Sequence, residues 1–116
     1  MPNRRVLVVD DNKVAADSAV KLLQLMGHEA KCAYTGGAAL NMVEEYRPEV
    51  VFVDLVMPDM DGIELGRRLR EKMPEVRTIA LSAFGGGELQ QATQAAGFDG
   101  HLTKPATAKV LTQILA

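Results

Sequence analysis

One stretch constrains the fold of this chain more than any other: the apolar run Val50-Val51-Phe52-Val53, which is followed directly by Asp54. An unbroken run of β-branched and aromatic residues is typical of a strand that is buried on both faces, as in the middle of a parallel sheet. Residues 55–62 then supply Pro, Asp and Gly, which are typical of a turn that leads into a helix. The pattern therefore predicts a buried strand that ends in a lone carboxylate, and it makes Asp54 the candidate reactive group.

Short strands and helices alternate along the rest of the chain. Apolar periodicity and capping residues predict strands over 6–9, 29–33, 50–54, 78–82 and 100–102, and helices over 13–26, 35–47 with Thr35 as the cap, 63–72, 88–96 and 107–115. The strand over 29–33 is the least apolar, so we expect it nearer an edge of the sheet. This alternation indicates an α/β fold: a flavodoxin-like, doubly wound (βα)5 sandwich with a five-stranded parallel sheet in the order 2-1-3-4-5.

Length and charge limit the classes of function. A chain of 116 residues with 47% hydrophobic composition predicts one domain over 1–116. The 13 Lys and Arg nearly balance the 15 Asp and Glu, so we expect no nucleic-acid partner and no membrane surface. The first apolar run, 6–9, is too short for a signal peptide or a membrane span, and the single Cys32, interpreted as a buried core residue, suits a reducing compartment. We therefore expect a cytoplasmic protein.

Polar side chains follow four of the predicted strands. Asp10 and Asp11 come after the first strand, Asp54 ends the third, Ser82 ends the fourth and Lys104 follows the fifth. In the predicted strand order the first and third strands are neighbours, so their carboxylates should converge at the switch point. Three carboxylates in one crevice repel one another unless a cation is present, and a hard, oxygen-seeking ion such as Mg²⁺ meets that need.

The remaining groups suit phosphoryl transfer. The Asp54 carboxylate can act as a nucleophile, while the metal and the ammonium group of Lys104 stabilise the phosphoryl oxygens. The Ser82 hydroxyl can donate a hydrogen bond to a phosphoryl oxygen, and Ala83 leaves room beside it. The Lys104-Pro105 bond is a candidate cis peptide that would aim the lysine into the site. Each residue alone is more often a cap or a solvated loop residue, and only their joint occurrence indicates chemistry.

Two loops border the predicted site. In the first, Asp59 and Asp61 are interpreted as turn and capping residues rather than metal ligands. The second, 83–87, contains three consecutive glycines, which predicts a mobile segment that moves when a phosphoryl group arrives.

Four segments together resemble the receiver domain of bacterial two-component response regulators, over essentially the whole chain. They are Val8-Val9-Asp10-Asp11, residues 53–62 (VDLVMPDMDG), Leu81-Ser82-Ala83 and Lys104-Pro105. The resemblance implies phosphorelay signal transduction, in which a phosphoryl group passes from a phosphohistidine on a histidine kinase or a histidine phosphotransfer protein to the aspartate at position 54. A member of this family is a switch that supports its own phosphorylation and slow dephosphorylation, not an enzyme with a separate substrate.

The resemblance also implies a role for each site residue. Asp11, Asp54 and the backbone carbonyl of Val56 would bind Mg²⁺, and Asp10 would act partly through water. Ser82 and Lys104 would contact the phosphoryl group.

The readout position departs from the commonest family pattern. His101 stands where Tyr or Phe is usual, so the resemblance makes it a switch residue together with Ser82, and its charge would make the switch sensitive to pH. The alternative interpretation is a surface histidine without a switching role. The predicted helix 88–96 has almost no charge, which argues against salt-bridged dimers, so we expect a monomer or weak dimer. We also expect it to act on an unknown downstream protein and to have no DNA-binding segment. Residues 95–102 resemble receivers at the carboxyl end of hybrid sensor kinases, so the chain is expected to be a stand-alone receiver or part of such a protein.

Three alternatives remain open. The same fold carries flavin mononucleotide in flavodoxins, but Asp10 and Asp11 stand where a phosphate-binding loop needs Ser, Thr or Gly. Mg²⁺-dependent phosphatases of the haloacid-dehalogenase type also use a strand-end Asp, but they carry a second Asp where this chain has Val56. A degenerate receiver that acts as a passive docking module would keep the fold without the phosphorylation, but the intact pair Asp10 and Asp11, with Asp54 and Lys104, argues against it.

Overall fold

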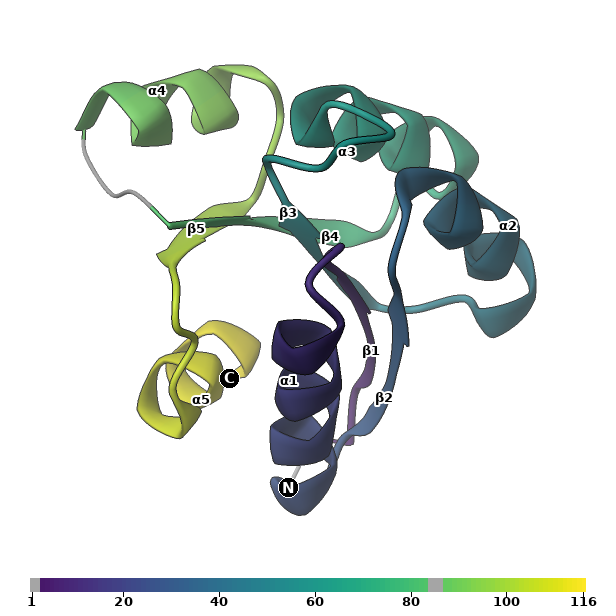
Figure 1. Cartoon of the computed structure of the whole chain (residues 1–116), viewed down its shortest axis with the longest axis vertical. Coiled ribbons are helices and arrows are strands. Elements are labelled where there is room, and N and C mark those ends of the chain that lie inside the picture. The colour runs from purple at the N-terminus through teal and green to yellow at the C-terminus, as the bar shows by residue number, and fades with distance from the viewer. Residues whose placement is uncertain (1–2, 84–86) are drawn as a thin grey trace.

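The structure of the chain is a computed structural model that describes residues 3–83 and 87–116. Within these residues, five parallel strands form one sheet in the order β2-β1-β3-β4-β5 (Figure 1). The strands are β1 (Arg5–Val9), β2 (Glu29–Ala33), β3 (Val50–Asp54), β4 (Arg77–Ser82) and β5 (Gly100–Thr103). The helices are α1 (Lys13–Leu25), α2 (Gly36–Tyr46), α3 (Gly62–Lys72), α4 (Gly87–Ala95) and α5 (Ala108–Leu115). The predicted α/β fold, the strand order and the edge position of β2 are confirmed.

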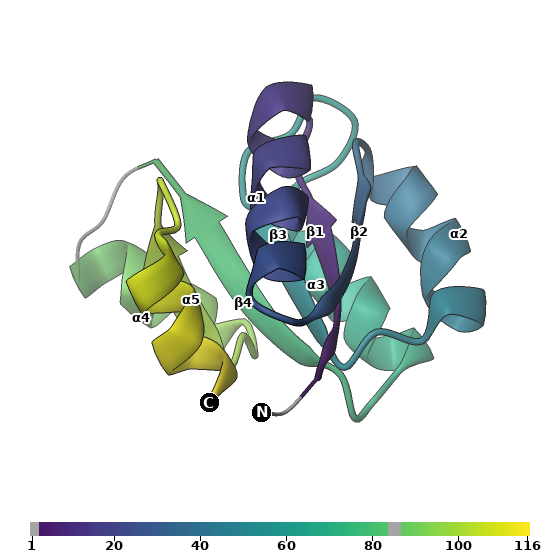
Figure 2. The same ribbon diagram turned by 90° about the horizontal axis from the view of Figure 1, so that it is seen from below.

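Helices cover both faces of the sheet. In Figures 1 and 2, α1 and α5 lie on one face, whereas α2, α3 and α4 lie on the other. Because side chains alternate along a strand, Leu7 and Val9 of β1 join a core cluster with residues of α2 and α3, while Val6 and Val8 join a second cluster with residues of α1 and α5. Strand β3 is buried along its whole length, which confirms the two-sided burial predicted from its apolar run.

Local sequence signals set the ends of the elements. The Thr35 hydroxyl accepts a hydrogen bond from the backbone N–H of Ala38 and caps α2, as predicted. After α1, Gly27 has a φ of 97°, a conformation that residues with a Cβ rarely adopt. Arg47 turns to a φ of 52° directly after α2, and Pro48 follows. Every observed boundary lies within one residue of the predicted one.

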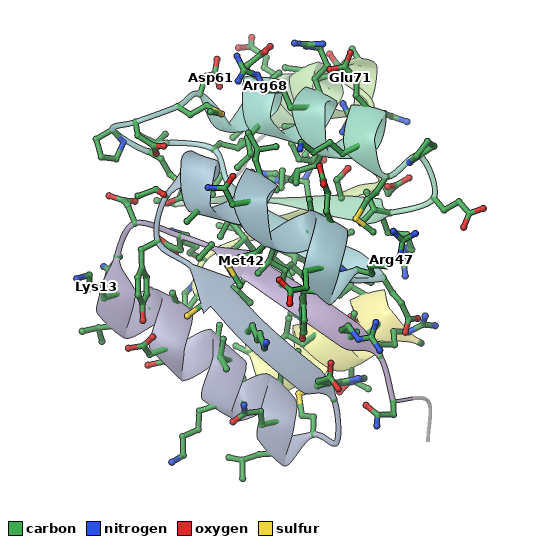
Figure 3. The ribbon with its side chains drawn as sticks, turned by 90° about the vertical axis from the view of Figure 1, so that its right-hand side faces the viewer. Lys13, Met42, Arg47, Asp61, Arg68 and Glu71 are labelled. Carbon is green, nitrogen blue, oxygen red and sulfur yellow. The ribbon has the colours of Figure 1, made fainter. Side chains whose placement is uncertain are left out.

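The outer faces of the helices differ in character. Charged side chains line the outer face of α3, where Arg68 pairs with Glu64 at 2.9 Å (Figure 3). On α1, by contrast, Val14 and Leu25 are 76% and 78% exposed. Part of the apolar surface of α1 therefore faces solvent.

Cys32 is half-exposed rather than buried, because it lies on the edge strand β2, and its Sγ donates to a carboxylate oxygen of Asp17 at 3.5 Å. The predicted mobile loop 83–87 falls mostly on residues 84–86, which are outside the described residues. In the described part of the chain, no helix is both long enough and apolar enough to cross a membrane.

Candidate functional site

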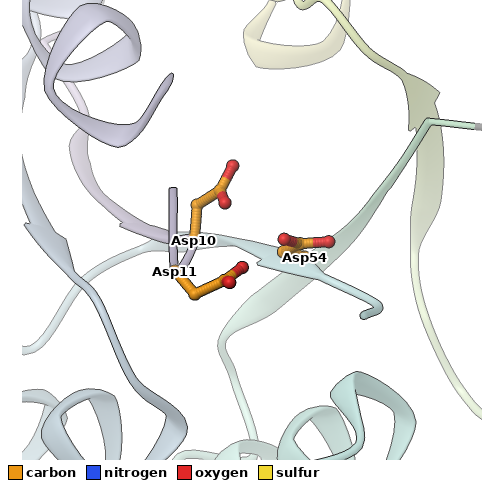
Figure 4. A group of neighbouring side chains, drawn as sticks. All are labelled: Asp10, Asp11 and Asp54. Carbon is orange, nitrogen blue, oxygen red and sulfur yellow. The ribbon is translucent and has the colours of Figure 1, made fainter. Parts of the chain in front are cut away.

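Three carboxylates meet where the neighbouring strands β1 and β3 end (Figure 4). Asp10 and Asp11 directly follow β1, and Asp54 is the last residue of β3. Asp10 and Asp54 are buried, with exposed fractions of 2% and 6%, whereas Asp11 is exposed. One oxygen of each carboxylate lies within 4.8 Å of the others. The convergence follows from the topology, because β1 pairs with β3 at the point where the strand order reverses.

Lys104 reaches the cluster from the loop between β5 and α5. Its Nζ donates a hydrogen bond to Oδ2 of Asp10 at 2.8 Å and lies 3.2 Å from Oδ2 of Asp54. Its backbone N–H donates to the carbonyl of Ser82 at 2.7 Å, and the Lys104-Pro105 bond is cis, as predicted. Burial works against the charge of Lys104, but the hydrogen bond to Asp10 and the charge of Asp54 outweigh it and raise the pKa of the lysine. A charged ammonium group therefore lies between two carboxylates.

Burial and the contacts of Asp54 shift the pKa of its carboxyl group in opposite directions. Burial removes water from the carboxylate and raises the pKa of Asp54 to about 6. The backbone N–H of Val56, which donates to Oδ1 at 3.1 Å, and the charge of Lys104 both act in the opposite direction. Asp54 is therefore a poorly solvated carboxylate that is still ionised near neutral pH, which suits both cation binding and nucleophilic attack.

The donor atoms of the cluster fit a hard divalent cation such as Mg²⁺, which binds through a few carboxylates and completes its shell with water and phosphate oxygens. Asp10 already uses both of its oxygens: Oδ1 accepts from the backbone N–H of Asn12 at 3.0 Å and Oδ2 accepts from Lys104. Asp11 presents an exposed carboxylate to the same space. Direct binding is therefore easier for Asp11 than for Asp10.

The loop between β3 and α3, residues 55–61, folds tightly beside the cluster. Val56 forms an isolated β-bridge with Asp61, and Asp61 caps α3 by accepting a backbone hydrogen bond at 2.9 Å, which confirms its predicted role. A Cβ on Gly62 would lie 2.5 Å from the backbone oxygen of Asp54, so only glycine fits there. The end of β3 and the start of α3 are thus in direct backbone contact.

The sequence indicates a turn at Asp59 but not the partners of its carboxylate. Oδ1 of Asp59 accepts a hydrogen bond from the backbone N–H of Gly36 at 3.2 Å, and Oδ2 accepts one from Gly37 at 3.3 Å. Both donors belong to the start of α2, far away in the chain. No local pattern encodes such a contact, because it depends on how two loops meet in space.

The two candidate switch residues lie on the neighbouring strands β4 and β5. Ser82 ends β4, is 7% exposed and pairs with Thr103. His101 lies earlier in β5, opposite Ala80, and is not part of the acidic cluster. Both ring nitrogens of His101 are buried and have no hydrogen-bond partner among the described residues. The ring borders a cavity of about 300 Å³ that residues of α4 also line.

Comparison with known proteins adds the family. The model of the response regulator receiver domain matches residues 6–116. Response regulator MprA from Mycobacterium avium is 34% identical over 101 residues, which cover 87% of this chain and 44% of MprA. The chain therefore spans less than half the length of that relative.

Solved structures agree with the family match. A CheY-like receiver domain protein from Methanospirillum hungatei has a TM-score of 0.88 and 27% identity, with 98% of this chain and 91% of that chain covered. The BeF3-activated receiver domain of DrrB, a protein of Thermotoga maritima, has a TM-score of 0.85 and 31% identity, with 98% and 95% covered. With the acidic cluster and the lysine in place, these matches lead to one conclusion: the chain belongs to the receiver domains of two-component response regulators.

Proposed function

We propose that this chain is a phosphoacceptor switch of a phosphorelay, in which Asp54 accepts a phosphoryl group from a phosphohistidine in the presence of Mg²⁺. The observation that carries the proposal is the meeting of Asp54 with Asp10, Asp11 and Lys104 at the switch point of the sheet. Family membership supports it, since receiver domains generally bind Mg²⁺ at this acidic pocket. The donor is a histidine kinase or a histidine phosphotransfer protein.

The transfer itself needs little covalent chemistry from the chain. An Oδ atom of Asp54 attacks phosphorus, the P–N bond of the phosphohistidine breaks, and its electron pair stays on the imidazole nitrogen. Lys104, whose Nζ lies 3.2 Å from the Asp54 carboxylate, turns toward a phosphoryl oxygen and stabilises the charge that the group carries. The Ser82 hydroxyl, at the end of the next strand, donates to another phosphoryl oxygen.

The residues proposed to hold Mg²⁺ are Asp11, Asp54 and the backbone carbonyl of Val56, with Asp10 acting partly through water. The hydrogen bonds that Asp10 already makes to Asn12 and Lys104 support its indirect role. When bound, the ion supplies positive charge that stabilises the phosphoryl oxygens during transfer.

The output of the switch is a changed protein-interaction surface. Phosphorylation adds a charge of about −1.5 to −2 and three acceptor oxygens, which draw Ser82 and Lys104 toward Asp54. His101, on the strand next to Ser82, is the proposed reporter of that movement. We further propose a single receiver domain over 1–116, cytoplasmic, monomeric or weakly dimeric, which supports its own phosphorylation and slow dephosphorylation and acts on a downstream protein.

The proposal is tested by incubating the protein with a small phosphodonor and Mg²⁺ and measuring its intact mass. Wild type should gain one phosphoryl group, and Asp54→Asn should gain none. An adduct on both proteins would mean that another residue is the acceptor. An adduct on neither would favour the passive docking module.

A further inference from the structure

The carboxylate of Asp59 joins the loop beside the phosphoacceptor to a helix on the face of the sheet that α2 and α3 cover. It accepts hydrogen bonds from the first two backbone N–H groups of α2, at 3.2 Å from Gly36 and 3.3 Å from Gly37. The positive end of the helix dipole favours a carboxylate at this place. In Figure 1 the loop after β3 reaches toward the start of α2.

This contact is not the ordinary cap of α2. Thr35 already caps the helix, because its hydroxyl oxygen accepts from the backbone N–H of Ala38 at 3.0 Å. Asp59 comes instead from another segment, and its neighbour Met60 packs on the same spot. A Cβ on Gly36 would lie 3.1 Å from both the Cβ and the Sδ of Met60, so the loop and the helix start are in close contact. The contact therefore joins two segments.

The loop is also held at its base and by Met57, which is 8% exposed and belongs to the core cluster shared with α2 and α3. Val56 bridges to Asp61, and the backbone N–H of Gly62 donates to the carbonyl of Leu55 at 3.2 Å. The side chain of Val56 is 81% exposed, so it does not anchor the residue. The direction of the Val56 carbonyl is therefore set by the backbone of the loop, which is held at its base by these bonds, in its middle by the buried Met57, and at its tip by Asp59 and Met60.

We propose that Asp59 is a positioning residue for the metal site: by holding loop 55–61 against the start of α2, it fixes the Val56 carbonyl that binds Mg²⁺. The role rests on the proposed function, because it requires Mg²⁺ at the acidic cluster. Asp59 itself does not touch the ion. It acts through the loop, as residues that orient metal ligands commonly do.

The test compares Mg²⁺ affinity, measured by titration calorimetry, in three variants. Asp59→Ala removes both hydrogen bonds and should weaken Mg²⁺ binding about tenfold, the lower end of the usual effect of losing a residue that orients a ligand. Asp59→Asn keeps one acceptor oxygen without the charge, so its loss of Mg²⁺ affinity should be smaller than that of Asp59→Ala. Thr35→Ala is the matched control: it removes a hydrogen bond at the same helix start without touching the loop, and its Mg²⁺ affinity should equal that of wild type.

Amide hydrogen exchange gives a second readout that does not depend on the ion. Exchange at Gly36 and Gly37 should speed up in Asp59→Ala, whereas in Thr35→Ala it should speed up at Ala38. Equal losses of affinity in Asp59→Ala and Thr35→Ala would overturn the proposal, because the effect would then come from weakening α2. Equal losses in Asp59→Ala and Asp59→Asn would overturn it too, because charge alone would explain them.

The same titration separates this role from the proposed function. If wild type binds no Mg²⁺, the proposed metal site fails and the role of Asp59 fails with it. If wild type binds Mg²⁺ and Asp59→Ala binds it equally well, only the role of Asp59 is overturned.

Discussion

Lys104 Nζ lies 2.8 Å from Oδ2 of Asp10 and 3.2 Å from Oδ2 of Asp54, so one ammonium group bridges carboxylates from two different strands. Its side chain keeps 27% of its surface exposed, whereas the two carboxylates are nearly enclosed. The lysine therefore offsets the repulsion between Asp10 and Asp54, and it is already in contact with the proposed acceptor before any phosphoryl group arrives.

Removal of this bridge should destabilise the metal-free protein. Lys104→Ala leaves two enclosed carboxylates facing each other without a cation, and the free energy of unfolding should fall by about 1–3 kcal/mol. Urea unfolding in the presence of a chelator measures this change. Lys109→Ala, which removes an exposed lysine from α5, is the control and should change stability little. Equal unfolding midpoints for the two variants would contradict the bridging role.

The raised pKa of Asp54 predicts how stability depends on pH. Because burial raises it from 3.8 to about 6, the folded state binds a proton more tightly than the unfolded state between these values, and the stability of the metal-free protein should fall as pH rises through that window. Asp54→Asn removes this dependence, so near neutral pH the variant should be more stable than wild type by on the order of 2 kcal/mol. Urea unfolding at several pH values, with a chelator, measures the difference.

Addition of Mg²⁺ should reverse part of this effect. A bound cation favours the ionised form of Asp54, so it should stabilise wild type near neutral pH and leave Asp54→Asn less affected. If the stability of metal-free wild type instead rises with pH between 3.8 and about 6, the raised pKa of Asp54 is contradicted.

The backbone contact at Gly62 should not tolerate a methyl group. A Cβ there would lie 2.5 Å from the backbone oxygen of Asp54, so Gly62→Ala must displace the end of β3 or the loop and should lower stability by about 1–3 kcal/mol. Gly37→Ala is the matched control in α2, because its Cβ would meet nothing within 4 Å. It should stabilise the helix by about 0.5–1 kcal/mol. Thermal unfolding of both variants gives the comparison, and a Gly62→Ala protein as stable as wild type would refute the close contact.

The ring nitrogens of His101 should lower the free energy of unfolding. Its ring nitrogens are buried without a hydrogen-bond partner among the residues that the structure describes, and an unmade hydrogen bond of this kind costs about 1–3 kcal/mol. His101→Phe keeps a ring without polar atoms, so the variant should unfold at higher denaturant concentration and still accept a phosphoryl group on Asp54. Urea unfolding and intact mass test the two parts separately. A lower unfolding midpoint would show that the nitrogens are satisfied in solution.

Much of this architecture is encoded locally. The apolar run before Asp54, the Thr35 cap and the glycine after α1 each act within a few residues, so they predict elements to within one residue. The acidic cluster is predictable for a different reason. Parallel strands end at the same edge of a sheet, so the strand order alone brings Asp10 and Asp54 together.

Contacts between distant loops are not encoded in this way. Asp59 has the sequence context of a turn residue because it follows Pro58 and comes shortly before Asp61 and Gly62. Its partners on α2 depend instead on how the two segments pack in space. The position of Cys32 in a strand predicts burial, but β2 is an edge strand and leaves one side of Cys32 open. Beside it, the Tyr34 hydroxyl donates to Asp17 at 2.5 Å. Side chains that cross between elements carry no periodic signal.

The location of the phosphoryl group decides whether Asp54 is the acceptor. Wild-type protein is treated with a small phosphodonor and Mg²⁺, the acyl phosphate is reduced with borohydride to an alcohol that survives digestion, and the peptides are sequenced by mass spectrometry. We expect one modified position, Asp54, and loss of the modification when Mg²⁺ is chelated before the phosphodonor is added. Modification at Asp10, Asp11 or any other residue, or equal modification of Asp54 without the metal, would contradict this expectation.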